Sequence, residues 1–197
     1  MFLQTVAEED ATGAIAHVYK KEKEGAGFVP ESARCFTTRP DLLPLFDAFF
    51  DGVRGGFSLE ARDWCLITLI AAKHIHSTYC SHVYSQRLTA LLGSKGAVLA
   101  IQRDYRNAGL PEREVAMLAY AERIATEAHR VEQADIDRLR AAGFSDRNIC
   151  DIALCVSLRC LISKFVDATG AVPEPAFVDA DEAFRKAMTV GRKLRDQ

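Results

Sequence analysis

The sequence predicts an all-α protein with one main core. Over its 197 residues, no stretch alternates apolar and polar residues with a period of two between turn residues, as a half-buried strand would. Amphipathic segments follow one another instead, separated by glycines and prolines. The run 149–165 is apolar on nearly every side, which indicates a buried helix. With 49% hydrophobic and 26% charged residues, the chain can bury a substantial core.

The N-terminal part is predicted to form three helical segments. A helix over 8–24 is stopped by glycines, and a short helical stretch follows. That stretch ends before Pro40, because the residue preceding a proline avoids the helical conformation. Asp41 is predicted to cap a helix over 42–53 that carries one apolar stripe of leucines and phenylalanines. We expect residues 1–56 to be a helical arm packed on the core.

The core is predicted to span 57–178, followed by a tail. Its segments begin at serine, proline or acidic residues and several end at glycine, as helices commonly do. The predicted core helices cover 58–72, 77–92, 94–104, 111–126, 131–142 and 145–165. The charged, amphipathic stretch 179–197 is predicted to be a C-terminal helical tail.

Charge and hydrophobicity exclude several classes of partner. The net charge is −2 and the basic residues are scattered, so no nucleic-acid surface is expected. No apolar run reaches the roughly 18 to 20 residues that cross a bilayer, and the first residues lack the features of a secretion signal. We expect a soluble, cytoplasmic protein that binds no membrane and needs no cofactor.

The cysteines do not form a metal-binding motif. Six are present and none belongs to a Cys-x-x-Cys pair, so a structural zinc site is not expected. Cysteines 150, 155 and 160 share no helical face and are predicted to fill the core. Any other metal site would need three convergent ligands from a set whose helical directions do not agree, and we predict none. That set is His74, His76, His82, Cys65 and Cys80.

The polar junction 73–84 carries most of the candidate chemistry. With Ser77 as N-cap, its hydroxyl is predicted to accept the backbone N–H of Cys80. Cys80 would then be the third residue of a helix, near the positive end of the helix dipole. Such a position favours the thiolate, which is the nucleophilic form. The alternative is a buried cysteine that acts only as a small hydrophobic residue.

Neighbours of Cys80 provide candidate acid–base and binding groups. His76 precedes the cap and is predicted near Cys80, and Tyr84 lies one turn beyond it on the same face. The two would serve as general base and hydroxyl donor. Tyr79 is a candidate substrate contact, whereas His82, offset by about 200°, is predicted to contact substrate or another subunit. Alternatively, the histidines are simply polar residues around a helix break.

Arg159 interrupts the apolar final helix. A buried arginine is rarely unpaired, so two interpretations follow. The favoured one is an ion pair with a carboxylate, such as Asp151, Asp167 or one from a neighbouring subunit. In the other, Arg159 faces a cavity and binds an anionic substrate.

Several short motifs follow one another from about Ala14 to Phe177. They are Gly27-Phe28-Val29-Pro30, Arg39-Pro40, residues 58–62 before an apolar helix, Tyr79-Cys80, and residues 135–146 with Ile149 and Asp151 beyond. Their order and spacing resemble the alkylhydroperoxidase D-like, carboxymuconolactone decarboxylase-like superfamily, specifically its peroxidase-related branch. The resemblance implies an all-helical domain that assembles as homo-trimers or hexamers.

The resemblance also places an active site at the junction. Peroxidase members carry Cys-x-x-Cys at a helix start, a histidine four residues later and a glutamate twelve residues before. These positions fall on Ser77, Cys80, Tyr84 and Cys65, so only Cys80 keeps the family's chemical group. A peroxidatic cysteine becomes a sulfenic acid that needs a partner thiol. Since Cys65 occupies the glutamate position, the resemblance makes a Cys65–Cys80 disulfide a hypothesis.

Two classes of function remain open from the sequence. The protein is either an enzyme or a catalytically inactive, oligomeric binding protein. As an enzyme it would be a thiol-dependent peroxidase that uses Cys80, a small-molecule substrate and an external thiol reductant. A non-redox relative would instead transfer protons on a small carbon acid with His76 and Tyr84. Retention of Cys80 favours an enzyme, whereas loss of the second thiol, the histidine and the glutamate argues against an efficient peroxidase.

Overall fold

The computed structural model describes residues 1–195 and confirms the all-α prediction. Within those residues the chain forms ten α-helices, joined by short turns and 3-10 segments, and no strand. The helices are α1 Gly13–Ala26, α2 Glu31–Arg34, α3 Leu43–Gly55, α4 Ala61–Ile75, α5 Thr78–Leu92, α6 Lys95–Asp104, α7 Glu112–Glu127, α8 Gln133–Ala141, α9 Asp146–Thr169 and α10 Glu182–Met188.

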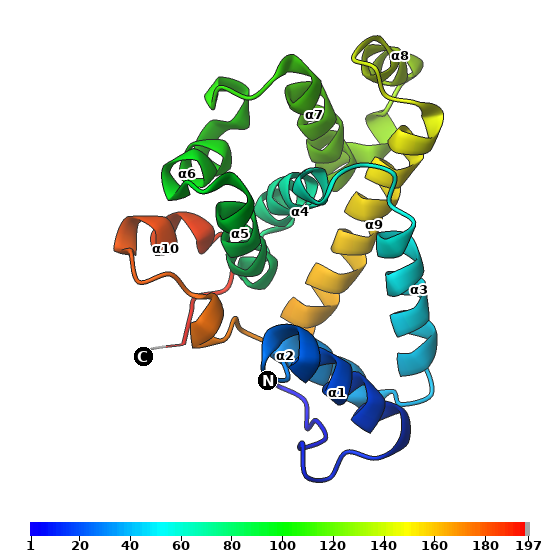
Figure 1. The fold of residues 1–197 in the computed structure, drawn as a ribbon, viewed down its shortest axis with the longest axis vertical. Helices are drawn as coiled ribbons and strands as arrows, with labels where there is room; N and C mark the ends of the chain where they lie inside the picture. The colour runs from blue at the N-terminus through cyan, green and yellow to red at the C-terminus, as the bar shows by residue number, and fades with distance from the viewer. Residues whose placement is uncertain (196–197) are drawn as a thin grey trace.

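Helix α4 lies at the centre of the core (Figure 1). It packs against α5, α7 and α9, which surround it. Residues 66–72 are fully buried, so this part of the helix has no solvent face. The apolar run that preceded the predicted junction is therefore the innermost element of the fold.

Helix α9 is the longest helix, with 24 residues, and only partly buried. Its inner residues pack on α4 and α7, but Leu154 and Leu161 are 41% and 52% exposed. The expectation of burial on nearly every side is therefore wrong for this single chain. The predicted homo-oligomer would cover this face, and a clean monomer in light scattering would contradict it. Neither α9 nor any other described helix is long and apolar enough to cross a membrane.

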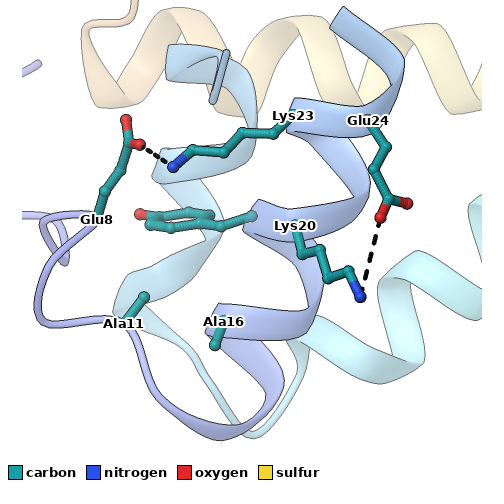
Figure 2. Close-up of a pocket in the computed structure, with 7 residues that line it drawn as sticks. Glu8, Ala11, Ala16, Lys20, Lys23 and Glu24 are labelled. Carbon is teal, nitrogen blue, oxygen red and sulfur yellow. Dashed lines mark ion pairs between the residues drawn. The ribbon is translucent and has the colours of Figure 1, made fainter. Parts of the chain in front are cut away.

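The N-terminal arm folds back against α9. Helix α3 packs on α9 and α1, and both ion pairs of Lys21 join α1 to α3, with Nζ 2.8 Å from Asp47 and 2.5 Å from Asp51. Figure 2 shows a surface pocket of the arm in which Glu8 pairs with Lys23 at 2.7 Å. Because these charges already satisfy one another, this pocket offers no unused group for chemistry.

Capping explains the main differences at the helix starts. Helix α4 begins at Ala61 rather than at residue 58, because Glu60 is the N-cap and forms a capping box with Asp63. Asp41 caps nothing and pairs with Arg39 instead. In the tail, the predicted helix covers 179–197. Of its described part, 179–195, only Glu182–Met188 is helical. The last two residues of that prediction lie outside the described chain.

Candidate functional site

A cavity of about 550 Å³ lies between the arm and the core. Helices α1, α2 and α3 line one side, and α5 and α9 line the other. Four of the residues singled out in the sequence line it together, namely Tyr79, Cys80, Tyr84 and Arg159. The arm therefore covers the helix start on which the sequence placed the site.

Cys80 occupies the predicted third position of α5 and is 3% exposed. Its Sγ accepts a hydrogen bond from the Ser163 hydroxyl, with Oγ 3.1 Å away. Ser163 stands four residues after Arg159 on α9, so both side chains lie on the face that meets Cys80. The thiol is thus held by a hydroxyl donor at the edge of the cavity.

Ser77 is the N-cap of α5, but its hydroxyl does not cap the helix as predicted. It lies instead beside the Asp167 carboxyl of α9, whose pKa burial raises and the Ser77 hydroxyl partly lowers. The predicted hydrogen bond from the Cys80 backbone N–H to the Ser77 hydroxyl is therefore wrong, since the Ser77 hydroxyl has no hydrogen-bond partner among the described residues.

Arg159 is 3% exposed and sits among aromatic rings. Its guanidinium carbon lies 5.3 Å from the Phe50 ring centre, 5.4 Å from Tyr84 and 5.8 Å from Trp64. Nη1 donates a hydrogen bond to the Tyr84 hydroxyl at 3.2 Å. Ring faces stabilise a cation without neutralising it. The charge of Arg159 is therefore held in place and not cancelled.

The favoured ion pair of Arg159 is wrong for the described chain. Its Nε and Nη2 have no hydrogen-bond partner. Asp151 accepts from the Ser58 backbone N–H at 2.9 Å and pairs with Arg147, while Asp167 lies beside Ser77. Each aspartate stands eight residues from Arg159, about 12 Å along the helix axis. The alternative interpretation, an arginine that faces a cavity, is the one that the structure supports.

The guanidinium of Arg159 keeps its charge. Burial alone would lower its pKa, but interactions with Tyr84, Cys80 and Cys155 raise that pKa above its ordinary value. A permanent positive charge consequently lies beside Cys80. Negative charge on a bound molecule is favoured there.

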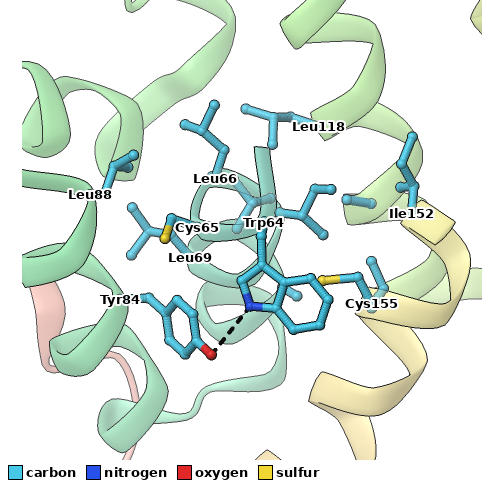
Figure 3. Packing of buried hydrophobic residues seen from close by; sticks show 14 of the residues in the cluster. Trp64, Cys65, Leu66, Leu69, Tyr84, Leu88, Leu118, Ile152 and Cys155 are labelled. Atoms are coloured by element: carbon cyan, nitrogen blue, oxygen red, sulfur yellow. Dashed lines mark hydrogen bonds between the residues drawn. The ribbon is translucent and has the colours of Figure 1, made fainter. Parts of the chain in front are cut away.

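The Tyr84 hydroxyl is a hydrogen-bond donor that the protein does not use. Figure 3 shows the Trp64 indole N–H directed at the Tyr84 oxygen, at 3.3 Å, and Arg159 donates to the same oxygen. A phenolic oxygen accepts two hydrogen bonds and donates one. Both accepting positions are filled, so the Tyr84 hydrogen remains available to a molecule in the cavity.

Tyr79 lines the cavity near the loop that follows α9. Its hydroxyl donates to Glu174 Oε2 at 2.9 Å, and burial together with the Glu174 charge raises its pKa well above the ordinary value. Tyr79 is therefore a neutral side chain, anchored at its oxygen. It presents its ring to the cavity.

Cys65 does not line the cavity. Figure 3 shows it within the apolar cluster of Leu66, Leu69 and Leu88, and burial raises the pKa of its thiol. All six cysteines are free thiols in this structure. The disulfide with Cys80 stays a prediction.

The three cysteines of α9 differ in their surroundings. Cys155 is fully buried, and burial raises its pKa to about 12, as fits the predicted core role. Cys150 is exposed and Cys160 half-buried. The core assignment is therefore wrong for Cys150, since one face of α9 points away from the core.

His76 lies in the turn between α4 and α5, not in the cavity. It has φ 61°, the only positive φ of a residue other than glycine in the described chain. Its exposed ring contacts the Val190 carbonyl oxygen through Nδ1 at 3.3 Å. Helix α4 continues through Ile75, so the turn is too short to fold His76 back over Cys80. The predicted pair of His76 and Tyr84 is not brought together.

His82 is fully buried under the segment that follows α10, away from the cavity lining. Its Nε2 lies 3.2 Å from Thr189 Oγ1. Burial, aided by the Arg185 charge and opposed by Asp179, lowers its pKa to about 4. In this chain its contacts are therefore intramolecular, and its predicted contacts with substrate or subunit remain predictions.

The buried His82 predicts a loss of stability in mild acid. Between pH 6.5 and pH 4 the unfolded chain binds a proton at this residue that the folded chain does not. The free energy of unfolding should fall by about 2 kcal/mol from pH 7 to pH 5 through His82 alone. Urea unfolding at both pH values measures this, with His82→Asn as the comparison. Equal pH dependence of the two proteins would contradict the assignment.

Solved structures share this arrangement of helices. An alkylhydroperoxidase AhpD core, an uncharacterized peroxidase-related protein from Ralstonia eutropha JMP134, is similar with a TM-score of 0.81 and 22% identity over 97% of both chains. A peroxidase-related protein from Silicibacter sp. TM1040 has a TM-score of 0.76 and 23% identity, over 82% of this chain and 85% of that one. The chain has the alkylhydroperoxidase D fold. No protein-family model and no curated protein sequence matches it.

The same alkylhydroperoxidase D fold occurs in a protein with a different named chemistry. The debrominase Bmp8 is similar with a TM-score of 0.76 and 19% identity, over 93% of this chain and 96% of that one. Its cysteine-to-alanine variant has been solved in complex with 2,3,4-tribromopyrrole. At these identities the likeness establishes the fold alone.

Three residues that the sequence analysis did not single out lie around Cys80 and Arg159 in the structure. Ser163 could have been found, since it follows Arg159 by one helical turn. Trp64 and Phe50 could not, because their positions depend on how α4 and α3 pack. Within residues 1–195, no three His, Cys, Asp or Glu side chains are grouped so that they could hold a metal ion.

Proposed function

We propose that this protein is a single-thiol enzyme in which Cys80 reduces a small hydroperoxide in the cavity. The observation that carries the proposal is a thiol that lines a cavity beside a buried, unpaired guanidinium, that of Arg159. The peroxidase-related proteins of the same fold support the type of chemistry.

The first step needs only groups that line the cavity. The Cys80 thiolate attacks the terminal oxygen of a hydroperoxide, so an S–O bond forms while the O–O bond breaks. Sulfur is oxidised to a sulfenic acid, and the leaving alkoxide takes a proton from water to become an alcohol. Arg159 offsets the negative charge, and the Tyr84 hydroxyl can donate a hydrogen bond to the leaving oxygen.

Recycling of Cys80 is assigned to an external thiol. No other cysteine lines the cavity, and the resemblance placed the partner thiol at Ser77. One external thiol condenses with the sulfenic acid, which releases water and leaves a mixed disulfide. A second thiol then displaces Cys80 and carries away the external disulfide.

The aromatic lining favours reductive dehalogenation as a second candidate. The cavity is lined by six aromatic side chains, Phe36, Phe46, Phe50, Tyr79, Tyr84 and Phe177. They suit a flat ring, and a debrominase with this fold has been solved with a brominated pyrrole. Here the Cys80 thiolate would take the halogen as a sulfenyl halide while the ring carbon gains a proton from water. One external thiol would then displace the halide and leave a mixed disulfide, and a second thiol would release Cys80.

The other two functions foreseen from the sequence have less support. Proton transfer on a carbon acid lacks its base, because His76 is at the surface and not in the cavity. An inactive binding protein would not explain why Cys80 lies beside the uncompensated charge of Arg159.

Trapping the sulfenic acid tests the proposed function. Reduced protein is treated with one equivalent of cumene hydroperoxide in the presence of dimedone, and peptides are mapped by mass spectrometry. We expect the adduct on Cys80 and not on Cys150, the exposed thiol that serves as internal control. Bromide release from tribromopyrrole with dithiothreitol identifies the second candidate. An unlabelled Cys80 without bromide release would favour a binding protein.

A further inference from the structure

The unpaired part of Arg159 is one edge of its guanidinium. Nη1 is used by Tyr84, whereas Nε and Nη2 have no partner. These two nitrogens lie on the same edge of the planar group and direct parallel N–H bonds outward. The side chain is 3% exposed, so water cannot readily satisfy them. An unsatisfied, buried, charged donor is costly, which indicates that a ligand completes it.

The geometry of this edge selects the ligand group. Two parallel N–H donors match the two oxygens of a carboxylate, which Arg binds in a bidentate manner. The carboxylates that line the cavity do not supply the match. Asp47 and Asp51 pair with Lys21, and Glu22, the third, makes no hydrogen bond to the free edge of Arg159. The lining holds four basic and three acidic side chains, so one positive charge is left over. A single anionic group would balance it.

The side chains around the free edge of the Arg159 guanidinium indicate the shape and polarity of the rest of the ligand. Rings of Phe50, Trp64 and Tyr84 lie around the guanidinium, and Phe36 stacks on Phe46 at 4.2 Å within the lining. Flat apolar groups pack well between such rings. A cavity of about 550 Å³ accommodates a molecule with one or two rings.

We infer that the substrate is a small, flat, aromatic carboxylate whose carboxylate binds Arg159 while its reactive substituent lies at Cys80. The inference rests on the proposed function in taking the cavity as the substrate site. It adds the group by which the substrate is recognised. The reacting atom is still the hydroperoxide oxygen or halogen that the Cys80 thiolate attacks.

Binding of benzoate against benzamide tests the inference without any reaction. The two probes share size and shape, but only benzoate carries the charge. Trp64 is the only tryptophan of the chain, and its ring is one of the three around the Arg159 guanidinium. Its fluorescence therefore reports whether a probe is bound in the cavity. We expect benzoate to bind at least about tenfold more tightly than benzamide to the reduced wild-type protein.

Variants then assign the preference to Arg159. Arg159→Met should remove it, and Arg159→Lys, which keeps the charge but lacks the parallel donors, should retain only part of it. Arg103→Met, at an exposed arginine outside the cavity, should bind like the wild type. Circular dichroism verifies that each variant is folded.

Two results would overturn the inference. One is equal affinity of the wild-type protein for benzoate and benzamide, which needs no variant to interpret. The other is a benzoate preference that survives in folded Arg159→Met. Absence of a dimedone adduct on Cys80 together with an Arg159-dependent benzoate preference would instead support the carboxylate site and refute the thiol chemistry.

Discussion

Replacing Cys80 by serine is expected to lower the hydroperoxidase kcat/KM at least about a thousandfold, because the reaction loses its nucleophile. A serine hydroxyl stays un-ionised at neutral pH, and no base that could activate it lines the cavity at this position. The substitution changes one buried atom, so the fold should persist. Consumption of cumene hydroperoxide with dithiothreitol as reductant measures the loss.

The matched control for this prediction is Cys150→Ser. Cys150 is exposed and does not line the cavity, so its replacement should leave the rate unchanged. Cys65→Ser is a further comparison, since a Cys65–Cys80 disulfide is a hypothesis that follows from the resemblance. An external thiol makes Cys65 dispensable, and we expect turnover to persist. Activity above a tenth of the wild-type value in Cys80→Ser would show that Cys80 is not the reacting group.

The sequence predicted those parts of the site that depend on local geometry. Cys80 and Tyr84 are four residues apart on one helix, so their shared face follows from the helical repeat alone. The helix start at Ser77 was also predictable, because a serine N-cap after a polar break is a local signal. His76 was misplaced because the two helices meet in a turn of only two residues, and a positive φ at His76 turns its ring outward.

The surroundings of Arg159 could not be predicted, since they come from distant segments. Phe50 belongs to the arm, Trp64 to the central helix and Tyr84 to the next one. The sequence presented a choice between an ion pair and a cavity. Only the packing of α3 over α9, which no local pattern specifies, decides it. The same packing creates the cavity, so site and arm are properties of the tertiary fold.

Replacing Arg159 by methionine is expected to slow the reaction of Cys80 with hydroperoxide about a hundredfold, while the folded state gains stability. The rate falls because the positive charge that stabilises the negative charge developing on the leaving oxygen is lost. Stability rises because a desolvated charge without an anionic partner costs several kcal/mol, whereas a buried methionine, which replaces only the aliphatic part of the arginine side chain, does not.

The size of the stability change follows from opposing contributions. Methionine forfeits the hydrogen bond to Tyr84 and the contacts with three rings, which together contribute about 3 to 5 kcal/mol. The desolvation that it relieves is larger, so we expect a net gain of about 1 to 3 kcal/mol in the free energy of unfolding. Urea unfolding measures this gain, and single-turnover oxidation of Cys80 measures the rate.

Measuring both the rate and the stability of Arg159→Met distinguishes a functional from a structural role of Arg159. Arg103→Met, at an exposed position, should change neither quantity. A purely structural Arg159 would lose stability on replacement, and any loss of rate would follow from partial unfolding. A fall of more than about 1 kcal/mol would mean that the guanidinium has an anionic partner in solution, such as a carboxylate of a second copy. A gain in stability with a loss of rate would mean that the buried charge is kept for chemistry, at the expense of the fold.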